Sequence, residues 1–377
     1  MSNLRGILRL AKKGVPDLII MVPGDPLSTH RGDVAFGLRL KEVLSAHLSC
    51  ALFGFRGHTL ERRQFLMSRR WITDLLGEVS NFDGIVLVWN SLKIGLVIMA
   101  FRKILRRRYR IIYVLPYLQR QNEWTHLEGT LARKLLPWFR VRVAYGLQLL
   151  TIGGVDGVIY HAYDRNTRTV QAAAKFSTGL CFPFVDTKVF AFNETSRREI
   201  RSYLGANKFV VGVIGPFGGD NLPSVEYVRS HIREFDADIT FLMIGQFDRT
   251  DSQFPQMRFV GHHVKDYIGY LSACDCVLIP RLVSSIGPLT KMVEAMSVGR
   301  AVITNNPQQM HVTNGVEVLT GSLDKLPGIL NLLTRNTSKM KDLGDNARRR
   351  VIEEYSADTF VREFLPFFQA VKSQTDT

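Results

Sequence analysis

The sequence predicts an α/β protein built from two doubly wound parallel sheets. Buried strands alternate with helices through the first half of the chain, and the same alternation starts again near residue 209. The strands are short apolar runs, typical of parallel strands that are covered on both faces. A length of 377 residues is enough for two domains with separate cores.

In the first half, each expected strand leads through a loop into a helix. The strands are expected at residues 17–22, 51–54, 84–88, 111–115 and 155–160. The helices are expected at residues 34–47, 65–79, 92–105, 127–150 (interrupted near Pro137) and 166–175. Residues 179–182 then lead into a linker.

The second half repeats this order. The strands are expected at residues 209–214, 240–244, 258–260, 276–279, 301–304 and 316–319. The helices are expected at residues 224–235, 264–273, 290–298, 325–333, 338–355 and 359–372. A Gly-rich loop, GPFGGDN, follows the first of these strands at residues 215–221. It lacks the spacing of a dinucleotide-binding loop, so it is weak as a motif when taken alone.

The most informative segment runs from Cys274 to Thr304 and predicts strand, loop, helix, turn and strand. Thr290 is expected to cap the helix and Gly299 to end it. Loops at the carboxyl ends of parallel strands are where open α/β sheets bind ligands. Lys291 and Glu294 lie about one helical turn apart, which suits a diphosphate joined to a ribose.

Three segments of the chain resemble one family. GPLTKMVEAMSVGRAVIT (287–304), CFPFVDTKVF (181–190) and RFVGHHVKDYIGYLSACDCVLIP (258–280) are similar, in order and spacing, to motifs of GT-B glycosyltransferases, especially the retaining enzymes of family 4. Together they cover residues 181–304. The N-terminal half matches only in outline.

The resemblance implies the GT-B fold, in which two Rossmann-like domains face a cleft and the last helix crosses back to the N-terminal domain. We therefore expect an acceptor domain at residues 1–185, a donor domain at 186–355 and a crossover helix and tail at 356–377. Phe360, Phe364, Phe367 and Phe368 would fit docking of that helix. The implied reaction is retaining transfer of a hexose from a nucleotide diphosphate sugar to an acceptor hydroxyl, with domain closure near residues 184–190.

The site residues follow from the residues and the resemblance together. Lys291 and Glu294 are the catalytic candidates. The donor-binding candidates are Gly215, Phe217, Gly218, His262, Arg281, Ser284, Ser285, Gly287, Thr290, Lys291 and Glu294. The acceptor-side candidates are Gly24, His30, Arg31 and Gly32 in the loop after the first strand. No cofactor beyond the donor substrate is expected, and no metal-ligand cluster is visible in the sequence.

The chain departs from the family motif in ways that leave an alternative open. The first of two motif glutamates would fall at Ile286, and the loop at residues 215–221 lacks the Arg and Lys that normally neutralise the diphosphate. Lys291 and Arg281 are the available substitutes. The alternative is a catalytically degenerate GT-B protein that serves as a binding or scaffold subunit. A sugar-nucleotide epimerase fits the quoted motifs less well.

The charge of the chain indicates an acidic partner for the first half. The net charge is +15, and basic clusters lie at Arg62–Arg70, at 102–110 and at Arg133–Arg142. An anionic membrane, a nucleic acid or a phosphorylated acceptor would fit. The segment 92–110 favours the inner face of a membrane, with a lipid-linked or polysaccharide acceptor, as in polysaccharide biosynthesis. A core helix with a solvated basic end is the alternative. No nucleic-acid-binding motif supports a nucleic-acid-directed glycosyltransferase.

The remaining features favour a cytoplasmic protein. No secretory signal or spanning apolar run is visible. Cys50, Cys181, Cys274 and Cys276 show no ligand spacing, so reduced thiols are expected. Cys274 and Cys276 should face opposite sides of one strand.

Overall fold

The structure is a computed structural model, and the chain forms two compact units. Unit 1 comprises residues 1–180 and 361–377, and unit 2 comprises residues 181–360. The described residues are 16–22, 32–54, 82–89, 91–115, 131–164, 167–205, 209–215, 222–245, 254–260, 266–282, 289–307 and 310–374. Among them no helix is both long enough and apolar enough to cross a membrane.

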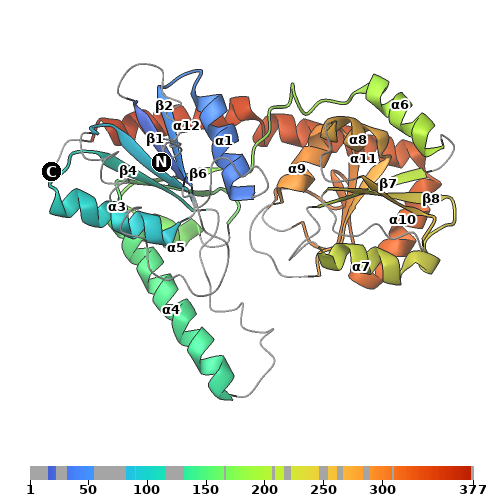
Figure 1. Ribbon diagram of the computed structural model, residues 1–377, viewed down its shortest axis with the longest axis horizontal. Coiled ribbons are helices and arrows are strands. Elements are labelled where there is room, and N and C mark those ends of the chain that lie inside the picture. Colours follow the sequence, from blue (N-terminus) through green and yellow to red (C-terminus); the bar gives the residue numbers. More distant parts are fainter. Residues whose placement is uncertain are drawn as a thin grey trace, which may run out of the picture. The chain divides into compact units, whose positions relative to one another are not determined.

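Unit 1 is built on a parallel six-stranded sheet of order β2-β1-β3-β4-β5-β6 (Figure 1). The strands are β1 (Leu18–Val22), β2 (Cys50–Gly54), β3 (Ile85–Trp89), β4 (Arg110–Leu115), β5 (Gly157–His161) and β6 (Ser177–Leu180). The sequence predicted no strand at β6, because residues 179–182 were interpreted as leading into the linker. Its four residues, STGL, carry too little apolar character to stand out as a strand.

Helices cover both faces of this sheet. They are α1 (Gly32–Leu44), α3 (Leu92–Ile104), α4 (Leu131–Gly154) and α5 (Thr167–Ala173). α3, α4 and α5 share a core with Met21, Val86 and Tyr113 of the sheet. The interruption expected near Pro137 is wrong, because α4 is one continuous helix. A proline removes one backbone donor, and a long helix can continue past it. The helix expected at residues 65–79 lies outside the described residues.

Unit 2 repeats the plan with a sheet of order β12-β11-β10-β7-β8-β9, again all parallel. The strands are β7 (Phe209–Ile214), β8 (Ile239–Ile244), β9 (Met257–Val260), β10 (Cys276–Ile279), β11 (Ala301–Thr304) and β12 (Val318–Thr320). The helices are α6 (Glu194–Leu204), α7 (Leu222–Ser230), η3 (Ile232–Glu234), α8 (Tyr267–Ala273), α9 (Thr290–Ser297), η4 (Leu323–Lys325), α10 (Leu326–Thr334) and α11 (Thr337–Glu354).

The two faces of the second sheet bury separate cores. α8, α9 and α11 pack on one face, and α7, η3 and α10 pack on the other. Cys274 belongs to the first core and Cys276 to the second. Strand alternation does not explain this, because residues two positions apart in a strand share a face; Cys274 instead lies before the strand, at the end of α8. Cys50, Cys274 and Cys276 are buried free thiols. Burial raises the pKa of the Cys274 thiol to about 12, so this thiol stays protonated and unreactive.

The last helix, α12 (Ala357–Lys372), begins in unit 2 and continues in unit 1. Phe367 stacks on Phe176 with ring centroids 5.0 Å apart, and both residues belong to unit 1. Phe360 instead stacks on Phe184 within unit 2, at 4.4 Å. The crossover of the chain is therefore confirmed. Phe360 differs from Phe364, Phe367 and Phe368 because it packs at the start of the helix, within unit 2.

Candidate functional site at the switch point of the second sheet

The strand order of unit 2 reverses between two neighbouring strands. From β7 the chain moves outward to β8 and β9, and it then returns to the other side of β7 to form β10, β11 and β12. β7 and β10 therefore lie side by side at the switch point, with Val211 paired to Cys276. At such a point the helices that follow the two neighbouring strands pack on opposite faces of the sheet. This leaves room for a ligand beyond the carboxyl ends of the strands.

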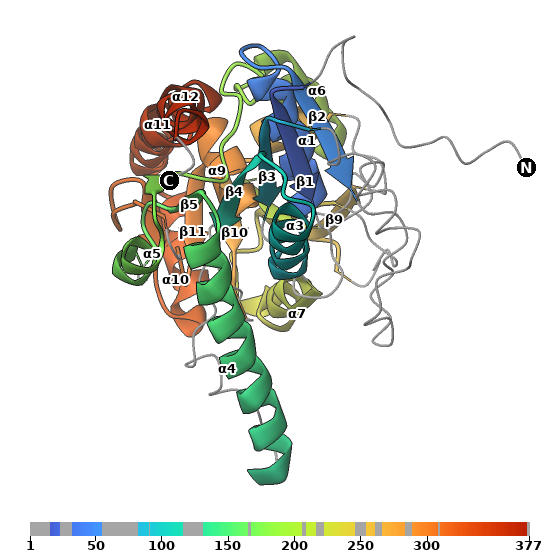
Figure 2. The same ribbon diagram turned by 90° about the vertical axis from the view of Figure 1, so that its left-hand side faces the viewer.

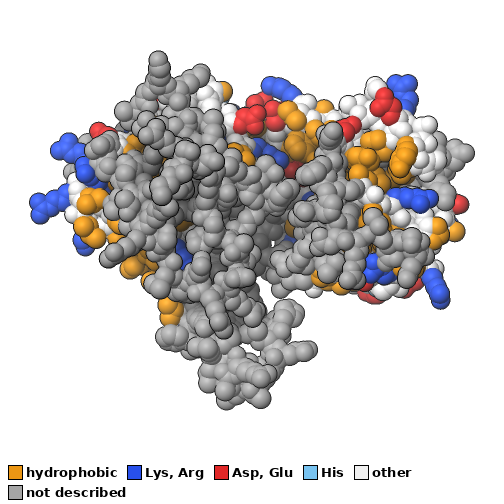
Figure 3. All heavy atoms as spheres, in the orientation of Figure 1, with side chains coloured by type: hydrophobic (Ala, Val, Ile, Leu, Met, Phe, Trp, Pro, Cys, Tyr) orange, Lys and Arg blue, Asp and Glu red, His pale blue; other side chains and the backbone are white. Residues whose placement is uncertain are grey.

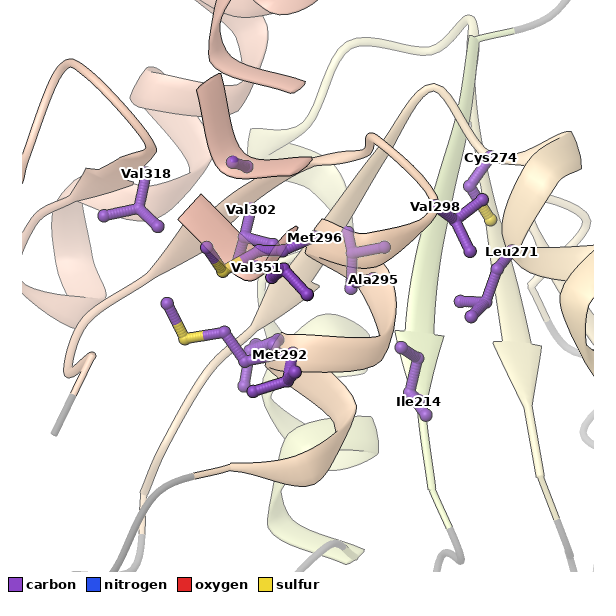
Figure 4. Packing of buried hydrophobic residues seen from close by; sticks show 14 of the residues in the cluster. Ile214, Leu271, Cys274, Met292, Ala295, Met296, Val298, Val302, Val318 and Val351 are labelled. Atoms are coloured by element: carbon purple, nitrogen blue, oxygen red, sulfur yellow. The ribbon is translucent and has the colours of Figure 1, made fainter. Parts of the chain in front are cut away.

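Helix α9 begins at this point. The Nζ atom of Lys291 donates a hydrogen bond to the carbonyl oxygen of Ile214, the last residue of β7, at 3.4 Å. The ammonium group therefore lies directly beyond the carboxyl end of the central strand. The residues that follow along α9 anchor the helix in the core, because Met292, Val293, Ala295 and Met296 are fully buried. Figure 4 shows Met292, Ala295 and Met296 among the other side chains of this core.

The start of α9 differs from the sequence prediction. Its N-cap residue is Leu289, and no side chain caps the helix. Thr290 is the first helical residue and is exposed, so the prediction that it caps the helix is wrong. The end was predicted correctly, because Gly299 has a φ of +75°, a conformation that glycine adopts without strain.

Two cations share the end of the sheet. Arg281 follows β10, and its backbone is fixed by Asn305, which follows β11. The Arg281 amide donates to Asn305 Oδ1 at 2.7 Å, and Asn305 Nδ2 donates to the Arg281 carbonyl at 2.9 Å. Burial, together with the charge of Arg281, lowers the pKa of Lys291 from 10.5 to about 8. Burial also lowers the pKa of Arg281. Like charges held together away from water favour the binding of an anion.

Glu294 lies one turn after Lys291 on the same side of α9 and is only 8% exposed. Its Oε2 atom accepts a hydrogen bond from the hydroxyl group of Tyr267 at 2.9 Å. Tyr267 is the first residue of α8, whose N-cap Asp266 accepts a hydrogen bond from the Gly269 amide at 2.7 Å. The carboxylate is therefore oriented by a second, independently capped helix.

The segment around Phe190, near the start of unit 2, also contacts α8 and α9. The hydroxyl of Ser297, in the last turn of α9, donates to the carbonyl oxygen of Phe190 at 2.7 Å. The Phe190 ring meets the Tyr267 ring edge-on, with centroids 6.4 Å apart. Tyr267 thus contacts both the carboxylate candidate and the segment for which the sequence predicted a hinge. Sequence reasoning missed this role of Tyr267, because the Tyr267–Glu294 pair joins two separate helices.

Gly215 lies where it was predicted, directly after β7. Its amide donates to the carbonyl oxygen of Ile244 at 2.8 Å, so this N–H group extends the sheet. Gly245 has a φ of +147°, and a Cβ atom there would lie 3.0 Å from the carbonyl carbon of Gly215. The two strand ends can approach this closely because neither residue carries a side chain.

The other candidates are placed as follows. Gly32 is the first residue of α1 in unit 1. Gly24, His30, Arg31, Phe217, Gly218, His262, Ser284, Ser285, Ile286 and Gly287 lie outside the described residues. The structure therefore brings together Arg281, Lys291 and Glu294 beside the end of β7, and the roles of all the candidates stay predictions.

Comparison with solved structures identifies the architecture. HepE of Anabaena in complex with UDP is similar at 17% identity with a TM-score of 0.66, covering 94% of this chain and 99% of that one. Sucrose-phosphate synthase of Thermosynechococcus elongatus is similar at 14% identity with a TM-score of 0.71, covering 94% and 98%. The chain has the GT-B fold.

A third similar structure is the apo form of WaaB, a lipopolysaccharide outer core galactosyltransferase. It shows 14% identity and a TM-score of 0.58, with 94% of this chain and 99% of that chain covered. Searches of family models and of curated proteins find no match for the sequence. These likenesses extend over nearly the whole chain, so they support the two-unit architecture and not only one half of it.

Proposed function

We propose that the protein is a glycosyltransferase that uses a nucleotide diphosphate sugar as its donor. The observation that carries the proposal is the pair of half-buried cations, Lys291 and Arg281, at the switch point, with the buried Glu294 in the next turn of α9. A diphosphate would compensate the two positive charges. The similar HepE structures contain UDP and UDP-glucose, which supports a donor of this chemical class.

Each residue has a defined task in this reaction. Lys291 and Arg281 bind the diphosphate and stabilise the negative charge that grows on it as the bond between the sugar carbon and the diphosphate oxygen breaks. The N-terminus of α9 adds a partial positive charge beside them. Glu294 accepts hydrogen bonds from vicinal hydroxyl groups of the ribose. An acceptor oxygen forms the new bond to the sugar carbon, and its proton passes to an oxygen of the leaving nucleoside diphosphate. One preorganised electrostatic contact of this kind contributes about 3 kcal/mol to lowering the barrier.

The finer assignment is also a proposal and comes from the motif resemblance of residues 181–304. It comprises transfer of a hexose, retention of the anomeric configuration, and a lipid-linked or polysaccharide acceptor at a membrane face. Proton NMR of the first product formed from an α-linked donor tests retention, since a β-linked product would exclude it.

The segment 92–110 supports the membrane part less than its sequence suggested. Ile94 and Ile98 of α3 are buried in the core of unit 1, so the apolar side of this helix is used for packing. Its end remains basic and exposed from Lys103 to Arg108, where Figure 3 shows Lys and Arg side chains. This arrangement matches the alternative of a core helix with a solvated basic end.

The proposal is tested by a thermal-shift panel with UDP-, GDP- and ADP-linked sugars. A donor that binds the folded state at 100 times its Kd stabilises it by about 2.7 kcal/mol, which shows as a higher melting temperature. We expect one nucleotide series to raise the melting temperature of the wild type, with the shift reduced in Glu294→Ala. Lys341→Met is the matched control, because Lys341 lies exposed on α11 and pairs with Asp345. No shift with any nucleotide sugar would refute the proposal.

Donor binding without turnover is a second candidate, favoured by Ile286 at the position where the resemblance expects a carboxylate. It predicts the same thermal shift as the enzyme. The two differ in donor hydrolysis, because only a catalytic site can transfer the sugar to water and release the nucleoside diphosphate when no acceptor is present. Release of nucleoside diphosphate that is lost in Glu294→Ala would exclude the binding-only function.

A further inference from the structure

Helix α4 presents a row of exposed apolar side chains. Val143, Leu147 and Leu150 are 42%, 38% and 62% exposed. Their spacing of four and three residues places them on one side of the helix. The other side packs on unit 1, where Ile152 is buried in the core and Leu149 packs against it. α4 is therefore apolar on both sides, and among the described residues only one of these sides packs in the core of unit 1.

The exposed row runs from Leu150, where α4 packs on unit 1, to Val143, on the part of α4 that extends past the sheet. Two contacts show how α3 and α4 are aligned. Near the start of α3, a Cβ atom on Gly95 would lie 3.0 Å from the Thr151 methyl group, and at the end of α3 Arg102 pairs with Asp156. Because both contacts advance along the two helices together, α3 and α4 run in the same direction. The residues of α4 before Leu147 therefore continue beyond the start of α3, which follows the carboxyl end of β3. At 1.5 Å per residue this part is about 25 Å long. Figures 1 and 2 both show α4 extending away from the sheet of unit 1.

The charge of α4 has one sign. Its sequence, LARKLLPWFRVRVAYGLQLLTIGG, contains Arg133, Lys134, Arg140 and Arg142 and no acidic residue. Counting back along the helix from Val143 in steps of four and three reaches Phe139, Leu136 and Ala132, so the apolar pattern continues through the sequence. Trp138 belongs to the same stretch. Apolar and aromatic residues interleaved with Lys and Arg are typical of helices that lie in the headgroup region of a bilayer.

We propose that the exposed row of α4 (Val143, Leu147 and Leu150) docks on an anionic lipid surface, with the basic residues of the helix against the phosphate headgroups. A second copy of the chain fits less well, because it would bring four further cations of α4 against the first four. A nucleic acid would satisfy the cations but would leave the aliphatic side chains exposed to water. An anionic bilayer satisfies both, and juxtaposed Lys and Arg near such a surface each strengthen the attraction.

This surface deepens the membrane part of the proposed function, by assigning it to α4, and does not depend on the donor site. It also differs in place from the basic end of α3. That end adjoins the amino ends of the strands, because α3 leads directly into β4, whereas the free part of α4 extends from the carboxyl ends, where parallel sheets bind their ligands. A bilayer along α4 would therefore lie on the side of unit 1 that bears its ligand-binding edge.

The test is co-sedimentation of the full chain with phosphatidylcholine vesicles that contain or lack phosphatidylglycerol. The variant is the triple substitution Val143→Ser, Leu147→Ser and Leu150→Ser. The matched control is Ile104→Ser with Leu105→Ser, which removes the exposed apolar side chains at the basic end of α3. We expect the wild type and the control to bind the phosphatidylglycerol vesicles in a salt-sensitive manner, and the triple variant to bind at least about tenfold more weakly.

Several outcomes would overturn the proposal. These are no binding by the wild type at about 0.1 M salt, equal binding by the triple variant, or loss of binding in the α3 control alone. Conversion of a lipid-free dimer to a monomer in the triple variant, seen by sedimentation velocity, would identify the row as a self-association surface instead. An unchanged melting temperature and an unchanged shift with nucleotide sugars show that the triple variant is folded. They also separate a failure of this inference from a failure of the proposed function.

Discussion

Replacing Lys291 with methionine should stabilise the protein in the absence of donor. Burial, and then the nearby charge of Arg281, lower the pKa of Lys291 from 10.5 to about 8. Keeping this ammonium charged at neutral pH therefore costs about 3 kcal/mol, at roughly 1.4 kcal/mol per pH unit. Methionine keeps most of the apolar stem but loses the hydrogen bond to the Ile214 carbonyl, which is worth about 1 kcal/mol. The expected net gain in the free energy of unfolding is about 2 kcal/mol.

The pH dependence of this gain has a definite sign. Between pH 8 and pH 10.5 the unfolded chain binds the Lys291 proton and the folded chain does not. Wild-type stability therefore rises with pH across this window, relative to the methionine variant. The advantage of Lys291→Met should be complete below pH 8 and should fade toward pH 10.5.

Chemical denaturation of both proteins at pH 7 and at pH 10 measures these differences. The same variant should lose most of the thermal shift caused by a nucleotide sugar, because the cation that pairs with the diphosphate is gone. A variant that is less stable than the wild type at pH 7 would refute the idea that the fold holds this charge at a cost. So would a stability difference that does not change between the two pH values.

Three further substitutions test the surroundings of the site. Tyr267→Phe removes the hydrogen bond to Glu294 and should raise the KM for the donor about fivefold with little change in kcat, measured by steady-state kinetics. An unchanged KM would show that Tyr267 does not orient the carboxylate. Asp275→Asn removes the charge that pairs with Arg197 and Arg201, and it should lower the free energy of unfolding by about 3 kcal/mol in urea titrations; a loss well below 1 kcal/mol would contradict this reasoning. Gly245→Ala forces a strained φ and a close contact with Gly215, and it should cost about 2 kcal/mol, with a melting curve as the check. A neutral effect there would mean that the two strand ends separate easily.

The sequence predicted most strands because each is a short apolar run, and it predicted α9 because its apolar residues and Gly299 mark the helix clearly. It missed α6, which has no buried residue. This helix is held by Arg197 and Arg201, which donate hydrogen bonds to Asp275 and to the carbonyl groups that end α8. Hydrophobic periodicity cannot detect a helix that is attached through arginines.

The site was predictable to the extent that its residues share one helix. Lys291 and Glu294 lie three positions apart, so their shared face follows from helical geometry. The Tyr267 hydroxyl reaches Glu294 from another helix, and Asn305 fixes Arg281 from another strand, so neither contact leaves a trace in the spacing of residues. The capping prediction for Thr290 failed because residue type alone does not decide which residue starts the helix.

The path of α12 decides how the protein can be divided. Unit 1 is completed by residues 361–377, and Phe367 and Val371 pack against Gly157 from across the sequence. A fragment that stops at residue 180 would leave this side of β5 and the Phe176 ring open to water, so it should aggregate when expressed alone. Joining residues 1–180 directly to 361–377 through a short flexible linker would restore the missing cover, whereas the complementary piece, residues 181–360, is already contiguous and is the natural choice for isolated donor-binding measurements.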